Sequence, residues 1–220
     1  MNGFPDIAHS YSAELARKSI HLSSLSIPVG YWMLDKGTAL SVLIPLTAAF
    51  ALTDLARIFL PSIGSVYHRW FGWLLRPAER DPGSRRLNGA TYVLLSACIC
   101  IWVFPKVVAI TAFTILIISD TLAALVGRRF GKRPLFAKTL EGTLTFLISA
   151  IGVVAFTPKI THAAAEYLVG MGGAVVGTAV ESISGGLDDN LTIPIAVGAA
   201  MWILYALVLP SVNVFGLDTL

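Results

Sequence analysis

The sequence predicts an all-α, polytopic membrane protein with about seven transmembrane helices and one cytoplasmic interfacial helix. Hydrophobic residues make up 55% of the 220 positions and charged residues only 13%, and the mean hydropathy is +0.75. Soluble domains carry about 25% charged residues. The apolar residues also gather in stretches near the ~20 residues that cross a bilayer. Because such helices use nearly the whole length, 1–220 is predicted to form a single integral membrane domain.

Seven apolar stretches are expected to span the membrane. They are 19–34, 38–59, 88–104, 106–127, 140–157, 163–182 and 191–209. A polar turn at 35–37 separates the first two, and Pro105 divides a long apolar run into a tight hairpin. Pro158 ends the fifth stretch, and a Gly- and Asp-rich segment at 185–190 separates the last two. Proline and glycine at these points interrupt helices.

The basic residues predict the orientation, since cytoplasmic loops carry an excess of Lys and Arg. Thirteen of the 16 fall on one set of connections: Arg17, Lys18, Arg57, Arg69, Arg76, Arg80, Arg85, Arg86, Arg128, Arg129, Lys132, Arg133 and Lys138. The other set holds only Lys36, Lys106 and Lys159. The N-terminus and the segments 58–88, 128–139 and 183–190 are therefore predicted to be cytoplasmic, with the C-terminus outside.

The segment 62–77 differs from the spans, because its apolar residues follow helical spacing along one stripe only. They are Ile63, Val66, Tyr67, Trp70, Phe71, Leu74 and Leu75. His68, Arg69 and Arg76 lie off that stripe. This pattern favours an amphipathic helix in the cytoplasmic interface over a soluble helix packed on loops.

Four ionisable residues share one helix face at the start of the first span: Glu14, Arg17, Lys18 and His21. Snorkelling towards lipid phosphates explains Arg17 and Lys18. It does not explain Glu14 and His21 on the same stripe, so this face is a candidate for function.

The end of the second span and the start of the third are open to two interpretations. Asp54 and Arg57 are three residues apart and either pair with each other or take part in catalysis. Most arginines between these spans are expected to meet anionic lipid headgroups. Arg86 and Asn88 instead stand at a helix entrance, where they are candidates to donate hydrogen bonds to a phosphate.

Asp120 lies inside an apolar span, seven residues before Gly127, and thus ~10 Å below the cytoplasmic end of that helix. A carboxylate at that depth requires a cation, a metal or a buried donor. Ala123, Ala124 and Gly127 share its face. These small residues leave room for a ligand or for a close helix neighbour.

The loop 128–138 carries five basic residues. It is read either as an ordinary cytoplasmic loop or, with Gly131, Lys132, Lys138 and the helix start at Thr139, as a cradle for a polyphosphate. Its glycine spacing excludes a Walker A loop.

Further carboxylates follow in the sequence. Glu181 ends the glycine-rich sixth span, and Asp188 and Asp189 precede the seventh. Grouped near basic residues, carboxylates suggest a hard cation such as Mg²⁺ that bridges to phosphate oxygens. Asp188 alone is also explained as a helix cap. Together these groups suit phosphoryl or nucleotidyl transfer to a lipid better than transport, because no internal repeat is visible.

Four motifs resemble the polyprenol kinase family, which includes dolichol, phytol and farnesol kinases and CTP-dependent diacylglycerol kinases. They are Glu14-x-x-Arg17-Lys18-x-x-His21, the Ser119–Lys132 block with Asp120 and Gly127, Lys138-Thr139-Leu140-Glu141-Gly142-Thr143, and Glu181-Ser182 followed by Asp188-Asp189-Asn190-Leu191-Thr192-Ile193-Pro194. The resemblance covers about residues 12–205. It implies transfer of the γ-phosphate of CTP to a lipid hydroxyl with a divalent cation. It also implies essential roles for Arg17, Lys18, Asp120 and Gly127.

From the resemblance and the residue chemistry we assign expected roles. The metal ligands expected are Asp120, Glu181 and Asp189. The residues expected to bind CTP are Arg86, Asn88, Gly127, Arg128, Gly131, Lys132, Lys138, Thr139 and Gly142. The catalytic candidates are Asp120, Arg17, Lys18, Glu14, His21 and Glu141, of which the last three are alternatives for orienting or deprotonating the hydroxyl.

Two other functions stay open. One is a phosphatidate cytidylyltransferase, although its Pro-Gly-His-Gly-Gly-x-x-Asp-Arg run is absent near the C-terminus. The other is a lipid transporter or binding protein without enzyme activity. The expected partners are a lipid alcohol and anionic headgroups, with no nucleic acid. The small-residue helix faces are equally suited to packing within one chain and to a homo-oligomer.

Overall fold

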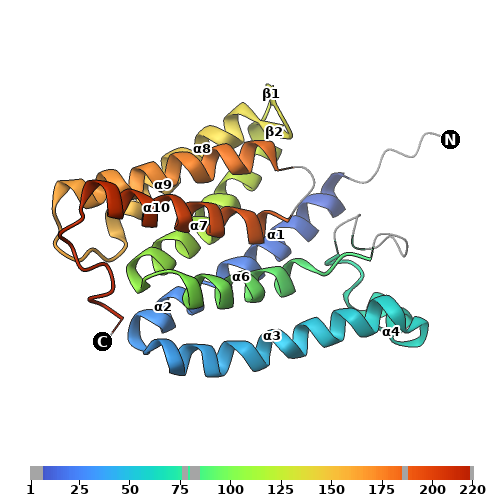
Figure 1. The fold of residues 1–220 in the computed structure, drawn as a ribbon. Coiled ribbons are helices and arrows are strands. Elements are labelled where there is room, and N and C mark those ends of the chain that lie inside the picture. Colours follow the sequence, from blue (N-terminus) through green and yellow to red (C-terminus); the bar gives the residue numbers. More distant parts are fainter. Residues whose placement is uncertain (1–6, 76–78, 80–84, 185–187, 219–220) are drawn as a thin grey trace.

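The computed structural model describes residues 7–75, 79, 85–184 and 188–218, and it is helical almost throughout (Figure 1). The helices are α1 (Ile7–Ser23), α2 (Ser26–Met33), α3 (Lys36–Phe59), α4 (Pro61–Phe71), α6 (Gly89–Val103), α7 (Lys106–Phe130), α8 (Leu140–Phe156), α9 (Ala164–Ile183) and α10 (Asp189–Val208). Strands β1 (Pro134–Leu135) and β2 (Lys138–Thr139) form one antiparallel hairpin. The all-α prediction is confirmed.

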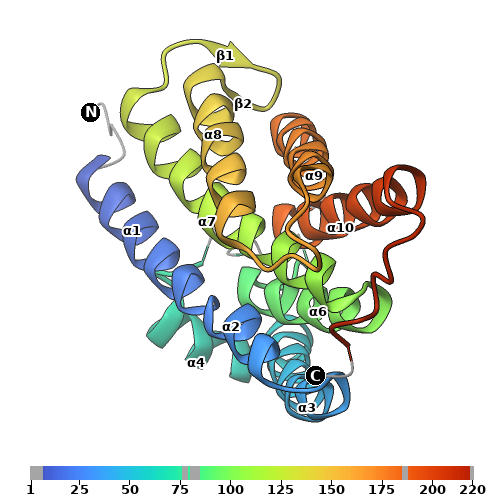
Figure 2. The ribbon, with the colours of Figure 1, turned by 90° about the vertical axis from the view of Figure 1, so that its left-hand side faces the viewer.

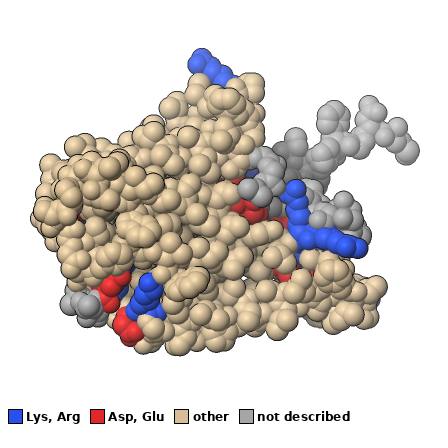
Figure 3. All heavy atoms as spheres, in the orientation of Figure 1, with Lys and Arg blue, Asp and Glu red and all other residues tan. Residues whose placement is uncertain are grey.

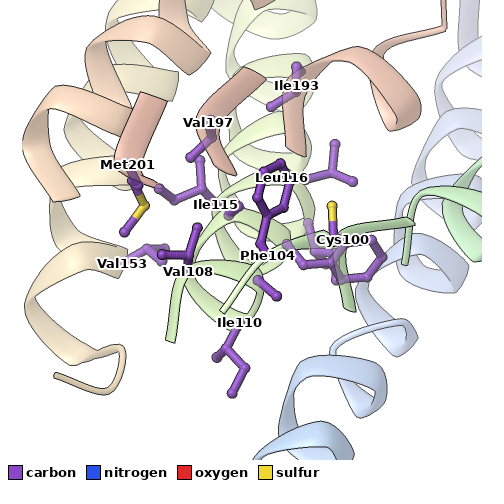
Figure 4. Packing of buried hydrophobic residues seen from close by; sticks show 14 of the residues in the cluster. Cys100, Phe104, Val108, Ile110, Ile115, Leu116, Val153, Ile193, Val197 and Met201 are labelled. Carbon is purple, nitrogen blue, oxygen red and sulfur yellow. The ribbon is translucent and has the colours of Figure 1, made fainter. Parts of the chain in front are cut away.

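Helix α7 is the centre of the fold. Figure 2 shows α1 and α2 on one side of it and α8 and α9 on the other, and α7 also packs against α6 and α10. Residues on all sides of α7 are therefore buried, among them Val108, Ile115 and Leu116. Figure 4 shows these side chains packed with Phe104, which follows α6, and with Val197 of α10. Asp120 thus belongs to the most enclosed helix.

Glycines bring α8, α9 and α10 close together. A Cβ atom on Gly173 would lie 2.6 Å from Met201 Cγ, and one on Gly177 would lie 2.6 Å from Val197 Cγ2 of α10. Such contacts are closer than real Cβ atoms make, so only glycine allows the two helices to approach this far. The glycine-rich sixth span therefore packs closely on α10.

The first expected span, 19–34, is not one helix. Helix α1 ends at Ser23, and α2 begins at Ser26 after a turn. Pro28 explains the break, because it has no N–H and its ring would clash with the carbonyl of Ser24 in a continuous helix. The hydropathy of this stretch hides the break, since both halves are apolar.

The other expected spans begin and end within a few residues of their predicted bounds. The predicted interfacial helix 62–77 is shorter than expected: α4 ends at Phe71, where Gly72 follows, and residues 72–75 form turns and a bend. Val66 and Trp70 of α4 are exposed. The last predicted positions 76–77, the basic residues Arg76 and Arg80, and the segment 185–187 lie outside the described residues. The hairpin β1–β2 was not predicted, because two strands of two residues leave no periodic pattern.

On the face seen in Figure 3, charged side chains gather at the lower left, towards the right and on one projection at the top, and the rest of this face is uncharged. At one end of the molecule, the three lysines outside the basic set satisfy helix ends or lie buried. Lys36 donates to Trp102 O at 2.6 Å, Lys159 donates to Val154 O at 2.7 Å, and Lys106 is 1% exposed. The other end contains the carboxylates and most basic residues of the predicted site.

Within the described residues, α3, α7 and α10 are long and apolar enough to cross a membrane, and α6 and α8 are shorter apolar helices. Together with the uncharged part of the face in Figure 3, they indicate an integral membrane protein. The count of seven spans and the orientation stay predictions.

Candidate active site

The polar face of α1 meets Asp120 of α7. Lys18 Nζ lies 2.5 Å from Asp120 Oδ2 and 3.3 Å from its backbone oxygen, and both side chains are buried. His21 Nε2 lies 3.7 Å from the same Oδ2. Asp120 therefore has the cationic partner that its depth in the membrane requires. The sequence predicted the need for a partner, and the structure identifies it as Lys18, 102 positions earlier.

A second ion pair lies next to the first. Lys138 of β2 reaches Asp189 Oδ2 of α10 at 2.7 Å and Glu181 Oε1 of α9 at 3.8 Å. Glu181 also accepts from Thr143 Oγ1 at 3.3 Å. Burial works against the Lys138 ammonium, but the carboxylates of Asp189, Asp120 and Glu181 outweigh it and raise the pKa of Lys138 above its usual value. Lys138 is thus charged at neutral pH.

Glu14 belongs to the outer edge of this cluster. Its carboxylate accepts from Arg17 and lies 3.1 Å from Arg128 Nη2 at the end of α7. Burial alone would raise the pKa of Glu14, but the hydrogen bond from Arg17 and the charges of Arg128, Arg17 and Lys18 hold it below its usual value. A carboxylate of low basicity is a poor proton acceptor. Glu14 is therefore the weaker of the candidate bases on this face.

A cavity of about 490 Å³ opens beside the Lys18–Asp120 pair. The four residues of the predicted α1 face line it, together with Asp120 and Asn190. Its remaining wall is mostly apolar and comes from α3, α4, α6 and the residues after α4. This size is typical of a small-molecule site. An apolar chamber with a charged end suits a ligand that is itself apolar with one polar end.

Asp54 is fully buried and is engaged in a separate network. It lies 3.1 Å from Arg57 Nε, and it accepts from Asn88 N at 2.7 Å and from Thr91 Oγ1 at 2.7 Å. Arg57 donates to the backbone oxygens of Glu79 at 2.9 Å and Arg86 at 2.8 Å. Asp54 and Arg57 therefore bind the connection between α4 and α6 to α3.

This network takes up the donors that Asn88 was expected to offer a phosphate. The Asn88 amide donates to Asp54 Oδ1 at 3.0 Å and to Tyr67 OH at 3.3 Å, and its own oxygen accepts from Thr91 N. The carboxylate of Asp54 is the anion at this helix entrance. Asp54, Arg57 and Asn88 are thus engaged with one another, and Asn88 also lines the cavity.

The expected polyphosphate cradle in the 128–142 segment is only partly formed. Glu141 Oε2 accepts from Lys132 N at 3.1 Å and from Arg133 N at 3.3 Å, so this carboxylate occupies the backbone donors of the loop. Thr139 accepts from Gly142 N and caps α8. Glu141 therefore shapes the loop, and Lys138 is the basic residue of β2 that reaches the carboxylate cluster.

Gly127 and Gly142 lie where α7 and α8 cross. A Cβ on Gly142 would meet Ala123 O at 3.1 Å and Gly127 Cα at 3.3 Å. We expect Gly142→Ala to destabilise the protein by about 1–3 kcal/mol, because backbone atoms must move apart. A lowered thermal midpoint of unfolding in detergent is the measurement.

Gly152, in the same helix, is the matched control. A Cβ there would meet nothing within 4 Å. Gly152→Ala should leave the midpoint unchanged or raise it, since alanine favours the helix. Equal midpoints for the two variants would contradict close packing at Gly142.

The predicted metal ligands have suitable chemistry but are each engaged by a lysine. No three His, Cys, Asp or Glu residues among those described are grouped as a metal site. Mg²⁺ often takes only one or two protein carboxylates and completes its shell with phosphate oxygens and water. Asp120 and Asp189 interact electrostatically across the cluster. The carboxylate set is therefore compatible with Mg²⁺ that arrives with a nucleotide.

Sequence reasoning missed Asn190 and the lining of the cavity. Asn190 is 2% exposed, lines the cavity, and its Oδ1 is buried without a hydrogen-bond partner among the described residues. Its place directly after two aspartates was a usable signal. Ala49, Phe50 and Thr53 of α3 also line the cavity, but in the sequence they resemble any other lipid-facing residues.

Comparisons with known proteins bear on the resemblance. An uncharacterised protein of Rickettsia prowazekii is 29% identical over 84% of this chain and 92% of its own length. The CTP-dependent diacylglycerol kinase 1 of Schizosaccharomyces pombe is 27% identical over 69% and 74%. The phytol kinase of Synechocystis is 24% identical over 86% and 79%. No family model and no solved structure matches the chain. The relatives confirm the resemblance to polyprenol and related lipid kinases.

Proposed function

We propose that this protein transfers the γ-phosphate of CTP to the hydroxyl of a membrane lipid alcohol at the cytoplasmic face. Relatives that are CTP-dependent diacylglycerol kinases and a phytol kinase support lipid phosphorylation and CTP as the donor. The relatives are named for different alcohols, diacylglycerol and phytol, so the proposal names the acceptor only as a lipid alcohol.

The observation that carries this proposal is the position of the Lys18–Asp120 pair. It lies at the polar end of a mainly apolar cavity, with Lys138, Glu181 and Asp189 behind it. A lipid alcohol placed there would present its hydroxyl to His21 and Asp120. The phosphates of a nucleotide would lie towards Lys18 and Lys138.

Each residue then has a chemical role. The lipid hydroxyl oxygen bonds to the γ-phosphorus, the bond to the β–γ bridging oxygen breaks, and CDP leaves. His21 takes the hydroxyl proton, because Glu14 and Glu141 are engaged with other donors. Lys18 and Lys138 neutralise the charge that moves to the leaving nucleotide, which is the main contribution a protein makes to phosphoryl transfer.

Asp120 and Asp189 would hold Mg²⁺, with Glu181 beside them. The ion neutralises phosphate charge when it is bound. In its absence Lys18 and Lys138 compensate these carboxylates, since uncompensated buried charges are strongly unfavourable. The same lysines are then available to turn towards a phosphate.

The cytoplasmic assignment follows from the charge pattern. The site lies at the end of the molecule that holds Arg17, Arg57, Arg128, Arg129 and Lys138, and cytoplasmic loops are enriched in such residues. The exposed aromatic side chains of α4 support a position of this end at the headgroup level, where its basic residues would meet anionic lipids.

The experiment is a transfer assay with purified protein in detergent, Mg²⁺ and CTP labelled in the γ-phosphate. Acceptors are phytol, farnesol, longer polyprenols and diacylglycerol, each in a separate reaction. We expect labelled lipid phosphate with at least one of them, and little label when ATP replaces CTP. Absence of labelled lipid with every acceptor would refute the proposal.

A further inference from the structure

The cavity beside Asp120 has an opening towards the bilayer. Helices α1 and α3 leave α2 in diverging directions (Figure 1). Helix α1 packs on α7, and α3 packs on α6 and α4. Helix α2 contacts both α3 and α7 and so closes the gap at the end far from Asp120. The cavity lies between α1 and α3, because residues of both helices line it.

Residues on the two sides of this gap both line the cavity and face outwards. Ile20 of α1 is 51% exposed, and Phe50 of α3 is 40% exposed. Ala49 and Thr53 beside Phe50 are exposed cavity residues as well. Side chains that belong to the cavity wall and to the surface mark its mouth. In a membrane this mouth opens onto lipid tails, not onto water.

The cavity wall has an apolar and a charged part. The apolar part includes Ile20, Ala49, Phe50 and Val93, of which the first three are exposed at the mouth, and the charged part includes Lys18 and Asp120. A lipid alcohol, with an apolar tail and one hydroxyl, matches both parts.

We infer that the acceptor lipid enters between α1 and α3, with its tail against Ala49 and Phe50 and its hydroxyl at His21 and Asp120. This inference rests on the proposed function and adds the location of the acceptor site. The tail continues from the mouth into the bilayer, so the cavity holds only the part of the lipid nearest the hydroxyl.

Another apolar groove, of about 680 Å³, offers a competing location. It lies between α2, α7 and α8 and is lined by Trp32, Ile118 and Phe156 among others. Asp120 and the α1 residues of the cluster do not line it. A tail bound there would leave the hydroxyl away from the charged groups.

A matched pair of substitutions tests the inference. Ala49→Trp fills the mouth, whereas Ala48→Trp places the same side chain on the neighbouring exposed position, which does not line the cavity. For a long-chain acceptor, Ala49→Trp should raise KM about tenfold, which corresponds to about 1.4 kcal/mol of binding free energy. KM for CTP should stay within about twofold, and Ala48→Trp should stay near wild type.

The activity of the wild-type protein distinguishes a failure of the proposed function from a failure of the proposed acceptor site. If it phosphorylates no lipid, the proposed function fails. If it is active and both tryptophan variants resemble it, the acceptor site is wrong while the function stands. A short-chain acceptor should be affected less by Ala49→Trp than a long-chain one, because it places less tail at the mouth. An equal effect on both would also contradict the tail location.

Photocrosslinking of wild-type protein covers the case in which Ala49→Trp does not fold. A lipid alcohol with a diazirine in its chain should label the α3 peptide around 49–53, and unlabelled acceptor should compete with this labelling. If unlabelled acceptor instead suppresses labelling of Trp32, Ile118 or Phe156, the tail lies in the other groove and the inference is overturned.

Discussion

Asp120→Asn is expected to lower lipid phosphorylation by at least about a hundredfold. The substitution removes the charge that Lys18 and His21 face and, in the proposed mechanism, a metal ligand. Losses of 10²–10³ are typical when one group that stabilises the transition state is removed. The measurement is the initial rate with labelled CTP in detergent. Activity near that of wild type would remove Asp120 from the mechanism.

This variant also leaves Lys18 buried without its partner. A loss of activity can therefore come from unfolding as well as from the loss of a catalytic group. Breaking a buried ion pair costs about 3–5 kcal/mol of stability, whereas replacing both partners is far less costly. The control is the double variant Lys18→Met with Asp120→Asn. We expect it to recover a higher thermal midpoint than Asp120→Asn while it stays inactive. Recovery of activity together with stability would show that the pair only holds the fold.

Asp54→Ala is expected to destabilise the protein by about 3–5 kcal/mol, because it leaves the buried guanidinium of Arg57 without its carboxylate partner. It also deprives Asn88 and Thr91 of their acceptor. The measurement is the thermal midpoint of unfolding in detergent. The loss of activity should follow the loss of folded protein.

The control is Asp35→Ala at the other end of α3. Asp35 accepts from Thr38 N and caps the helix, but it is exposed. Its loss should lower the midpoint far less than the loss of Asp54. If Asp54→Ala instead kept the wild-type midpoint but lost activity, Asp54 would be catalytic, the other interpretation that its spacing to Arg57 allows.

Features that depend on the residues of a single helix, such as its bounds and the residues that share one face, were predictable from the sequence. Helix α7 spans Lys106–Phe130 against a predicted 106–127, because Pro105 and the apolar run define its start. The shared face of Glu14, Arg17, Lys18 and His21 follows from helical spacing alone, and all four residues line the same cavity. The break before α2 was also signalled, by Pro28, but uniform hydropathy masked it.

Contacts between distant segments were not predictable in this way. The sequence shows that Asp120 needs a partner, but the choice of Lys18 depends on how α1 lies against α7. Asn88 was assigned to a phosphate because it stands at a helix entrance, and Glu141 was a candidate for orienting or deprotonating the lipid hydroxyl. In the structure their partners are Asp54 and the loop backbone. An internal carboxylate and a bound phosphate satisfy the same donors, so spacing alone does not separate them.

The most direct test of the account compares CTP labelled in the α-phosphate with CTP labelled in the γ-phosphate, using the same purified protein and Mg²⁺, with a lipid alcohol and phosphatidate supplied as acceptors in separate reactions. A kinase transfers only the γ-phosphate, so we predict label in the lipid from γ-labelled CTP and none from α-labelled CTP. Label from the α-phosphate would identify a cytidylyltransferase. Label from neither would leave a lipid transporter or binding protein, and either result would contradict the proposed function.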